Sequence, residues 1–473
     1  MVFLGKKPAQ AGMIKSGLGK FEMGDIADIA AGRLSAEDLS KNFDDMYPAL
    51  GASKAIIEAS RCYFCYDAPC MEACPTGIDI PNFIRKIQTG NYRGSALDIL
   101  SENIMGGACS RVCPTEILCE EVCVRMSQEE KPVTIGKLQR FATDWLMETG
   151  EQPFERAAST GKTVAVVGAG PAGLSAAHRL SMLGHDVEIF EALAKSGGLN
   201  EYGIAAYKLP HGIAQQEVDF ILSLGGITVH NGKALGSNVS LAELNAKFDA
   251  VFVGTGLGAV RALGFENEGL AGVYNAVEYI AELRQSETKE DIAVGRKVVV
   301  IGGGNTAIDV AVQAKRLGAE DVTLVYRRGP EDMSATHHEQ EYAQTNGVTI
   351  KHYAKPVSIE ESGGVISGIT FEYTAKDASG KLVGTGETFQ QAANMVFKAI
   401  GQVFVPEPVT RSATSLEIQD GRIVVDEDRA SSVPGVYAGG DCILGGEDLT
   451  VTAVQDGKLA AHAIDTYLKT AQA

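Results

Sequence analysis

The chain has 473 residues, which at roughly 100–200 residues per domain predicts about three domains. Hydrophobic residues make up 45% and charged residues 22%, a globular composition that excludes a disordered or fibrous chain. The net charge of −18 argues against nucleic-acid binding, which requires clustered lysine and arginine side chains.

Targeting signals are not evident. No run of about 18 apolar residues occurs, so no membrane span is expected. The segment 1–20 contains lysines but no apolar core of a secretory signal, so we expect a cytoplasmic, reducing environment. The 54 glycines indicate many tight turns or close approaches of the backbone to ligands.

The first region, residues 1–155, is rich in cysteine and has a helical pattern. Asp79 can cap a helix that runs to Ile87, and Ile135 to Met147 has the periodicity of an amphipathic helix. Of the nine cysteines, eight lie between Cys62 and Cys123. In a large chain without a secretory signal, this density indicates metal or cluster binding rather than disulfides.

The cysteines form two sequential quartets. They are Cys62-x2-Cys65-x4-Cys70-x3-Cys74-Pro75 and Cys109-x3-Cys113-Pro114-x4-Cys119-x3-Cys123. A Cys-x-x-Cys start and a Cys-Pro end are typical of [4Fe–4S] binding. Two structural zinc sites are the alternative, because four-cysteine zinc sites use similar spacings.

The second region opens with a strand–turn–helix–strand pattern: Thr163 to Val167, then Pro171 to Leu183, then Asp186 to Phe190. The turn from Gly168 to Gly173 fits G-x-G-x-x-G, in which the glycines allow a tight turn and close approach to a pyrophosphate. Glu191 ends the next strand, where a carboxylate can bind ribose hydroxyls. These features predict a dinucleotide site.

A second such unit follows: Lys297 to Ile301, then Asn305 to Leu317, then Asp321 to Tyr326. Its turn, Gly302 to Ala307, fits the G-x-G-x-x-A variant. Arg327 and Arg328 follow the second strand, where a guanidinium suits the 2′-phosphate of NADPH. The nearby acids Glu331 and Asp332 would repel a phosphate, so NADH stays open, and a solvated basic pair is the structural alternative.

We therefore expect an α/β protein in which a helical domain with two [4Fe–4S] clusters precedes two interleaved Rossmann-like domains. The expected ranges are 1–155 for the cluster domain, 156–288 and 394–473 for the two parts of the FAD domain, and 289–393 for the NAD(P) domain.

These motifs carry a family resemblance. The double unit resembles the two-dinucleotide flavoprotein reductases, with 436–441 similar to their second flavin motif and 399–401 to their junction motif. The cysteines resemble the two-cluster domain of glutamate synthase small subunits and dihydropyrimidine dehydrogenase. The strings 61–75, 135–141 and 207–210 are closest to the NAD(P)H-oxidising subunit of bacterial dihydropyrimidine dehydrogenase. The similarity covers about residue 40 to the C-terminus.

The resemblance implies a ligand set that crosses between the quartets. One cluster would use Cys62, Cys65, Cys70 and Cys123, and the other Cys74, Cys113, Cys119 and Gln139. Cys109 would then not be a ligand, although spacing alone does not decide between Cys109 and Gln139. The remaining candidates share a role in binding FAD or NAD(P)H, and they are Gly168, Gly170, Pro171, Ala172, Gly173, Leu174, Glu191, Gly198, Leu199, Lys208, Leu235, Gly256, Gly303, Gly304, Asn305, Thr306, Arg327, Arg328, Ala399, Gly401, Gly440, Asp441, Thr450 and Thr452.

The resemblance also implies a function. Electrons would enter from NAD(P)H, pass through FAD and two [4Fe–4S] clusters, and leave to an FMN-containing subunit that reduces uracil or thymine in a hetero-oligomer. No side chain is expected to act as a general acid or base.

Three alternatives compete with this function, and the second of them is nearly excluded. One is a glutamate synthase small subunit, against which Gln139 argues, because those subunits carry glutamate at that place. Another is a dithiol reductase, which needs a Cys-x-x-Cys near the flavin, whereas no cysteine lies between Cys123 and Cys442. The third is a non-enzymatic iron–sulfur redox sensor.

Overall fold

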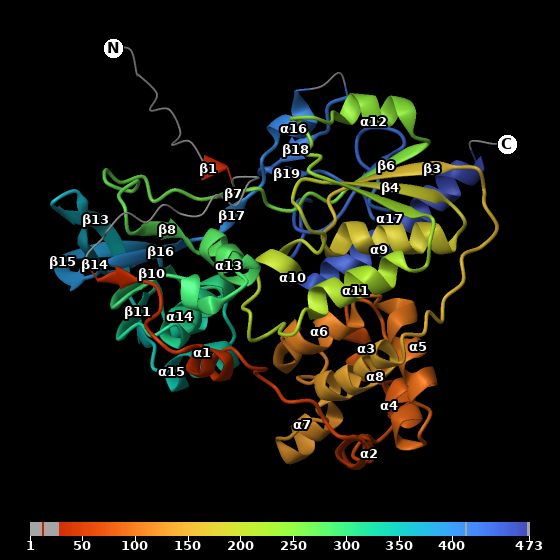
Figure 1. The fold of residues 1–473 in the computed structure, drawn as a ribbon, viewed down its shortest axis with the longest axis horizontal. Helices are drawn as coiled ribbons and strands as arrows, with labels where there is room; N and C mark the ends of the chain where they lie inside the picture. The colour runs from red at the N-terminus through yellow and green to blue at the C-terminus, as the bar shows by residue number, and fades with distance from the viewer. Residues whose placement is uncertain (1–11, 14–27, 412–413, 471–473) are drawn as a thin grey trace. The chain divides into compact units, whose positions relative to one another are not determined.

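The computed structural model describes residues 12–13, 28–411 and 414–470 (Figure 1). It separates into two compact units. Unit 1 comprises 1–44, 202–207 and 258–403, and unit 2 comprises 45–201, 208–257 and 404–473. Most of the segment 1–20, on which the expectation about a secretory signal rests, lies outside the described residues. No helix in the described ranges is long and apolar enough to cross a membrane.

The N-terminal part of unit 2 is helical, as the cysteine-rich region predicted. Asp79 caps one helix by accepting the N–H of Asn82, and this helix buries Ile80, Phe83, Ile84 and Ile87 on one side. Another helix ends where Gly150 adopts a φ of 68°, a left-handed conformation that favours glycine. The helices of this part are α2 (Ala52–Ala59), α3 (Pro69–Glu72), α4 (Ile80–Gln88), α5 (Tyr92–Glu102), α6 (Gly106–Val112), α7 (Val124–Glu129) and α8 (Ile135–Thr149), with a 3-10 turn at Thr115–Ile117.

The rest of unit 2 is built on a five-stranded parallel sheet in the order β20-β6-β3-β4-β5. The strands are β3 (Thr163–Val167), β4 (Asp186–Glu191), β5 (Ile227–Asn231), β6 (Ala250–Val253) and β20 (Val436–Ala438). The helices are α9 (Pro171–Met182), α10 (Leu199–Tyr202), α11 (Ile213–Leu222), α12 (Leu241–Lys247), α16 (Glu407–Thr410) and α17 (Thr450–Thr470). Helices α9 and α17 pack side by side beneath the sheet (Figure 1). This strand order reverses between β3 and β6, and parallel sheets bind ligands at such a switch point.

Unit 1 repeats the arrangement with a parallel sheet in the order β12-β11-β10-β16-β8. Its strands are β8 (Val273–Asn275), β10 (Lys297–Gly302), β11 (Asp321–Val325), β12 (Thr349–Lys351) and β16 (Met395–Ala399). Its helices are α1 (Ala36–Asn42), α13 (Ala276–Gln285), α14 (Asn305–Arg316) and α15 (His337–Thr345), with 3-10 turns at Lys289–Asp291 and Pro330–Asp332. Strands β8 and β16 both belong to this sheet, although the range expected for the NAD(P) domain, 289–393, contains neither of them.

Smaller sheets complete both units. In unit 1 an antiparallel sheet consists of β13 (Ala354–Ser362), β14 (Val365–Lys376) and β15 (Leu382–Ala392). Short pairings link β1 (Gly12–Met13) and β17 (Gln402–Val403) to β7 (Ala259–Val260), and β2 (Ile29–Ala30) to β9 (Val294–Gly295). In unit 2, β18 (Ile418–Gln419) pairs with β19 (Arg422–Ile423).

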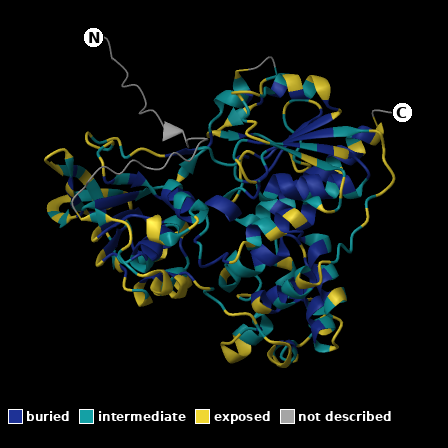
Figure 2. Ribbon diagram, in the orientation of Figure 1, coloured by how far each residue is buried: buried dark blue, intermediate teal, exposed yellow. Residues whose placement is uncertain are grey.

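The core runs through both parallel sheets (Figure 2). In β3, residues Val164 to Val167 are all buried, because helices or loops cover both faces of a parallel sheet. One hydrophobic cluster continues from this sheet into the helical part, where it includes Phe83, Leu138 and Leu146. The cysteine-rich helices therefore share a core with the first glycine-loop domain.

Candidate functional site

The first glycine loop joins β3 to α9. Gly168 has a φ of +96°, and a Cβ there would lie 2.4 Å from the carbonyl oxygen of Gly254. A Cβ on Gly173 would lie 1.9 Å from the carbonyl oxygen of Gly168. Only glycine fits at either position, so the N-terminus of α9 approaches the loop closely, with Pro171, Ala172 and Leu174 in its first turn. This geometry matches a pyrophosphate cradle.

Glu191 ends β4 beside this loop. Its Oε2 accepts the N–H of Ala169 at 2.7 Å, and its Oε1 accepts the N–H of Leu193 at 2.7 Å. Burial raises the pKa of this carboxyl, and the backbone donors oppose that rise. The carboxylate is thereby fixed in orientation at the strand end.

Three further glycine candidates lie around the first loop. A Cβ on Gly198 would lie 2.7 Å from the Cα of Gly170, so the loop that leads into Leu199 packs onto the glycine loop. A Cβ on Gly440 would lie 3.3 Å from the Cβ of Ala172, and one on Gly256 would lie 3.3 Å from Oδ1 of Asp441. Burial, and then the charge of Asp448, raise the pKa of Asp441 to about 6.

A buried asparagine also reaches this region. Asn200 is fully buried, its Oδ1 accepts the hydroxyl of Thr450 at 2.8 Å, and its Nδ2 has no hydrogen-bond partner within the described chain. Since buried amides are almost always paired, this donor fits a ligand oxygen. Sequence reasoning missed Asn200, and its neighbour Leu199 was the only local signal.

The remaining candidates are less concentrated. Lys208 is buried, Leu235 packs against the core under β20, and the hydroxyl of Thr452 donates to Glu447 at 2.8 Å. Ala399 and Gly401 lie in unit 1, where Ala399 ends β16 and packs against Gly302. These two candidates therefore lie in unit 1, whereas the first glycine loop lies in unit 2.

The second glycine loop joins β10 to α14 in unit 1. Gly304 precedes the helix, whose first residues are the candidates Asn305 and Thr306. A Cβ on Gly303 would lie 2.4 Å from the ring of Tyr326, and one on Gly304 would lie 3.1 Å from Oγ of Ser334. Tyr326 and Ser334 therefore flank this loop, and sequence reasoning had not singled out either as a nucleotide contact.

The arginine pair follows β11 beside this loop. Arg327 is exposed and Arg328 is half-buried, and neither makes an ion pair within the described part of the chain. Of the two nearby acids, Asp332 lies 3.6 Å from Nζ of Lys376. The guanidinium groups are therefore available to an anion.

Four cysteines from distant turns converge in unit 2. One pocket is lined by Cys62, Cys65, Cys70 and Cys123, together with apolar side chains that include Ile80, Ile84, Val133 and Ile135. Burial raises the pKa of Cys62 and raises that of Cys70 to about 12. Such thiols lose their protons when a metal compensates the charge. The pocket therefore brings Cys123 together with three cysteines of the first quartet, Cys62, Cys65 and Cys70.

The other cysteines gather nearby. Cys113 hydrogen-bonds to Cys109, and the thiols of Cys119 and Cys74 lie close enough to raise the pKa of Cys113 further. Cys74 also contacts the hydroxyl of Thr76 at 3.3 Å. Gln139 is buried on α8 and donates from Nε2 to the carbonyl of Gly106 at 2.8 Å. Both candidates for a fourth ligand, Cys109 and Gln139, are thus held by contacts to or within α6.

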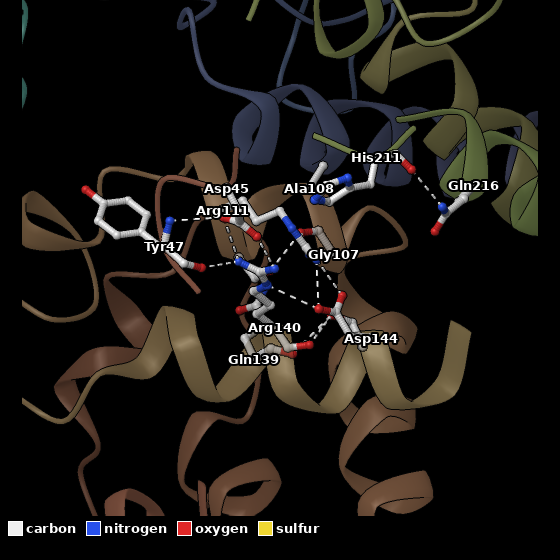
Figure 3. Close-up of polar contacts among 12 residues, drawn as sticks. Asp45, Tyr47, Gly107, Ala108, Arg111, Gln139, Arg140, Asp144, His211 and Gln216 are labelled. Carbon is white, nitrogen blue, oxygen red and sulfur yellow. Dashed lines mark hydrogen bonds and ion pairs between the residues drawn. The ribbon is translucent and has the colours of Figure 1, made fainter. Parts of the chain in front are cut away.

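An ion-pair network fixes α6 to α8 (Figure 3). Arg111 donates to both carboxylate oxygens of Asp144 at 2.8 Å, and Arg140 pairs with Asp144 at 3.1 Å. Arg140 also reaches Asp45 at 2.5 Å and the carbonyl of Tyr47. Arg111 lies on α6 between Cys109 and Cys113, and Arg140 follows Gln139 on α8, so the network fixes the two helices that carry these candidates.

Two side chains link the glycine-loop part of unit 2 to the cysteine loops. Glu217 on α11 accepts the N–H groups of Gly107 and Ala108 at 2.8 and 3.0 Å. Lys458 on α17 donates to the carbonyl of Thr76 at 2.8 Å and to Glu102 at 2.7 Å. Both contacts join residues more than 100 positions apart, and sequence reasoning missed both.

The residues present fit the expected cofactors. The first loop has the glycine cradle and the orphaned Nδ2 of Asn200 for FAD, and the thiol pocket has four sulfurs in apolar surroundings for a [4Fe–4S] cluster. Within the described ranges, no group of three or more His, Cys, Asp or Glu side chains is arranged to hold a single metal ion. A [4Fe–4S] cluster does not require its ligands to converge on one metal ion, because each ligand binds a separate iron atom.

The fold and the two glycine loops define a class, the two-dinucleotide flavoprotein reductases. The model of the pyridine nucleotide-disulphide oxidoreductase family matches residues 162–457, and that of dihydropyrimidine dehydrogenase domain II, 4Fe-4S cluster, matches residues 39–151. A solved structure with a similar fold is FprA from Mycobacterium tuberculosis, with a TM-score of 0.54 and 20% identity over 66% of this chain and 85% of that chain.

Two curated relatives narrow the class. The NAD-dependent dihydropyrimidine dehydrogenase subunit PreT of Salmonella typhimurium is 36% identical over 429 residues, covering 90% of this chain and 98% of the relative. The glutamate synthase [NADPH] small chain of Escherichia coli is 34% identical over 450 residues, covering 90% and 94%. The chain belongs to the family of FAD and iron–sulfur oxidoreductase subunits that contains both.

This membership confirms the expected fold class, FAD and [4Fe–4S] as cofactors, and NAD(P)H as the electron donor. The chain is an NAD(P)H-dependent oxidoreductase.

Proposed function

We propose that the chain is the electron-entry subunit of a dihydropyrimidine dehydrogenase. It oxidises NAD(P)H and passes the electrons to an FMN-containing partner subunit that reduces uracil or thymine. The observation that carries the proposal is that the thiol pocket and the first glycine loop lie in one compact unit with a shared core. The similarity to PreT over nearly its whole length supports the choice of partner.

Each cofactor has its own set of residues in this proposal. FAD is held by the loop from Gly168 to Leu174, by Glu191 and by Asp441, with Asn200 and Thr450 completing the contacts. NAD(P)H is held by the loop from Gly303 to Thr306. One cluster takes Cys62, Cys65, Cys70 and Cys123, and the other takes Cys74, Cys113, Cys119 and Gln139.

When bound, FAD would accept a hydride from the nicotinamide and the clusters would carry the electrons singly. The chain's own residues bind and orient these cofactors. The backbone N–H groups of Ala169 and Leu193 hold the carboxylate of Glu191 in place, and each of its oxygens keeps a lone pair that a ribose hydroxyl could donate to. Asn200 is fixed by Thr450 with its amide donor free for an acceptor. The apolar wall of the thiol pocket excludes water around the sulfurs.

NADPH is the proposed donor, because Arg327 and Arg328 stand without carboxylate partners in the described chain. NADH is the alternative, since PreT is named NAD-dependent. A cytoplasmic location is also part of the proposal, because the nine free cysteines suit a reducing compartment.

A reconstitution experiment tests the proposed function. The chain is mixed with an FMN-containing dihydropyrimidine dehydrogenase subunit, and the oxidation of NADPH or NADH is measured with uracil as substrate. Uracil-dependent oxidation that needs both proteins is expected. A chain that instead supports glutamate formation with a glutamate synthase large subunit would assign it to the second candidate, which the 34% identity to the small chain favours. Steady oxidation of either nucleotide with a dye acceptor would exclude the redox-sensor alternative.

A further inference from the structure

Large apolar side chains are exposed in the two cysteine-bearing loops of unit 2. Tyr63, Tyr66, Ile117 and Val122 are 48%, 106%, 58% and 39% exposed. They lie between or next to the cysteines: Tyr63 and Tyr66 beside Cys65, and Val122 beside Cys123. Tyr63 itself lines the thiol pocket. We call these four side chains the cluster face.

The charges around this face are uneven. The segments 57–72 and 114–131 hold eight carboxylates and three basic side chains. Two of the basic side chains are already engaged. Arg61 pairs with Glu58, and Arg125 stacks on the ring of Tyr63 at 4.0 Å and pairs with Glu129.

Four carboxylates beside the face are exposed, namely Asp67, Glu72, Glu121 and Glu130, and within the described part of the chain none of them makes an ion pair. Asp67 follows Tyr66 directly, and Glu121 precedes Val122. The free charge in these two segments is therefore mostly negative. Two exposed basic side chains lie near the face, namely Lys131 and Arg85, whose guanidinium lies 4.6 Å from the ring centre of Phe64.

We propose that the cluster face is the docking surface for the electron-accepting partner, a protein that presents an apolar contact with a rim of lysine and arginine beside its own redox group. An apolar centre with a charged rim is the usual anatomy of such an interface. Opposite charges on the partner would steer its approach and orient it. Tyr63 lines the thiol pocket together with Cys65 and Cys123, and Tyr66 and Val122 are the chain neighbours of these two cysteines, so a protein seated there would lie beside the proposed cluster. This inference rests on the proposed function.

The test measures electron transfer from the full chain to two acceptors. A basic cytochrome c serves as the probe for a protein with a lysine-rimmed redox group, and ferricyanide serves as a small acceptor that needs no docking. One variant is Tyr66→Ser with Val122→Ser, and another is Asp67→Lys with Glu121→Lys. The matched control is Tyr373→Ser with Val383→Ser, which removes an exposed tyrosine and an exposed valine from the β14–β15 sheet of unit 1.

Both cluster-face variants are expected to raise KM for cytochrome c about 10-fold or more, while the control, the ferricyanide rate and the iron content stay at wild-type values. The wild-type rate with cytochrome c is expected to fall as ionic strength rises.

An unchanged KM in both variants, or wild-type reduction of ferricyanide but not of cytochrome c, overturns the docking surface and leaves the proposed function intact. Failure of the wild-type chain to reduce either acceptor overturns the proposed function and this inference with it. A dimer of the chain in light scattering that both variants dissociate would assign the face to self-association instead.

Discussion

Glu217 shows how one buried side chain can tie two parts of unit 2 together. It is fully buried, and its Oε1 accepts two backbone N–H groups from the start of α6 while its Oε2 has no partner within the described chain. Burial raises the pKa of Glu217 to about 7. Between about pH 4.5 and 7 the folded chain therefore holds a proton that the unfolded chain has lost.

This proton has a predictable effect on stability. Because the folded-state pKa is raised, the contribution of Glu217 is most favourable at low pH and is lost as the pH rises through 7. Replacing Glu217→Gln keeps the acceptor but removes the charge, so we expect the variant to be more stable than the wild type at pH 8, by up to about 3 kcal/mol, and equal to it near pH 4.5. Thermal unfolding between pH 4.5 and 8 measures this difference. Glu121→Gln, on the surface, is the control, and parallel wild-type and Glu217→Gln curves would contradict the account.

Lys458 forms the other contact between the glycine-loop part of unit 2 and the cysteine loops. Its ammonium group is held against the carbonyl of Thr76, two residues from Cys74, and is only 11% exposed. A nearby positive charge stabilises the reduced, more negative form of a cluster. We expect Lys458→Met to lower the potential of the cluster for which Cys74 is a proposed ligand by about 30–60 mV, equivalent to roughly 1 kcal/mol. A redox titration followed by electron paramagnetic resonance measures this. Lys458→Arg should keep the wild-type potential, and an unshifted potential in Lys458→Met would refute the role.

At the scale of elements, the packing of α6 against α8 depends on buried charges. Arg111 is 4% and Arg140 10% exposed, and both rely on Asp144. Replacing Asp144→Asn removes the ion-pair partner of Arg111 and leaves Arg140 paired with Asp45. Breaking a buried pair costs about 3 kcal/mol. We therefore expect a lower unfolding temperature and loss of iron from the cluster proposed at Cys74, Cys113, Cys119 and Gln139, measured by calorimetry and iron assay. Glu148→Gln, exposed on the same helix, should change neither, and full iron content in Asp144→Asn would argue against the network.

The loop after β11 is the element that we expect to select the nucleotide. Replacing Arg327→Ala and Arg328→Ala together removes both candidate phosphate contacts. A charge-assisted hydrogen bond contributes about 1.5–3 kcal/mol, so KM for NADPH should rise roughly 10- to 100-fold while KM for NADH stays the same. Steady-state kinetics with both nucleotides decide this. An equal rise in KM for both nucleotides would mean that Arg327 and Arg328 do not bind the 2′-phosphate.

At the scale of the whole molecule, local sequence signals were sufficient to predict the strand, loop and helix of both glycine-loop units. Strand β3 begins and ends as expected, and α9 and α14 begin at Pro171 and Asn305 as expected, because a glycine turn forces strand, loop and helix into register. The resemblance implied that Cys123 shares a cluster with Cys62, Cys65 and Cys70, and these four cysteines line one pocket. The spacing of the cysteines could not reveal this grouping, because the grouping depends on how α4 and α8 bring distant turns together.

What the sequence could not reveal is the set of long-range contacts. Glu217 reaches α6 across 110 positions, and Lys458 reaches Glu102 across 356. A lone glutamate or lysine on an amphipathic helix has no local feature that distinguishes it from a surface charge. The ligand set and the domain boundaries stay predictions. Strand β8, for example, pairs with β16 in the sheet of unit 1, although it lies before residue 289, where we expected the NAD(P) domain to begin.

An anaerobic titration of the purified chain with NADPH and then NADH tests the central claim most directly. Visible absorption is followed, and iron and sulfide are assayed on the same sample. Bleaching of the flavin followed by the clusters, with about eight irons and eight sulfides per chain, is the result that electron entry through FAD and two [4Fe–4S] clusters predicts. Reduction of the flavin in a chain that contains zinc and no sulfide would contradict it.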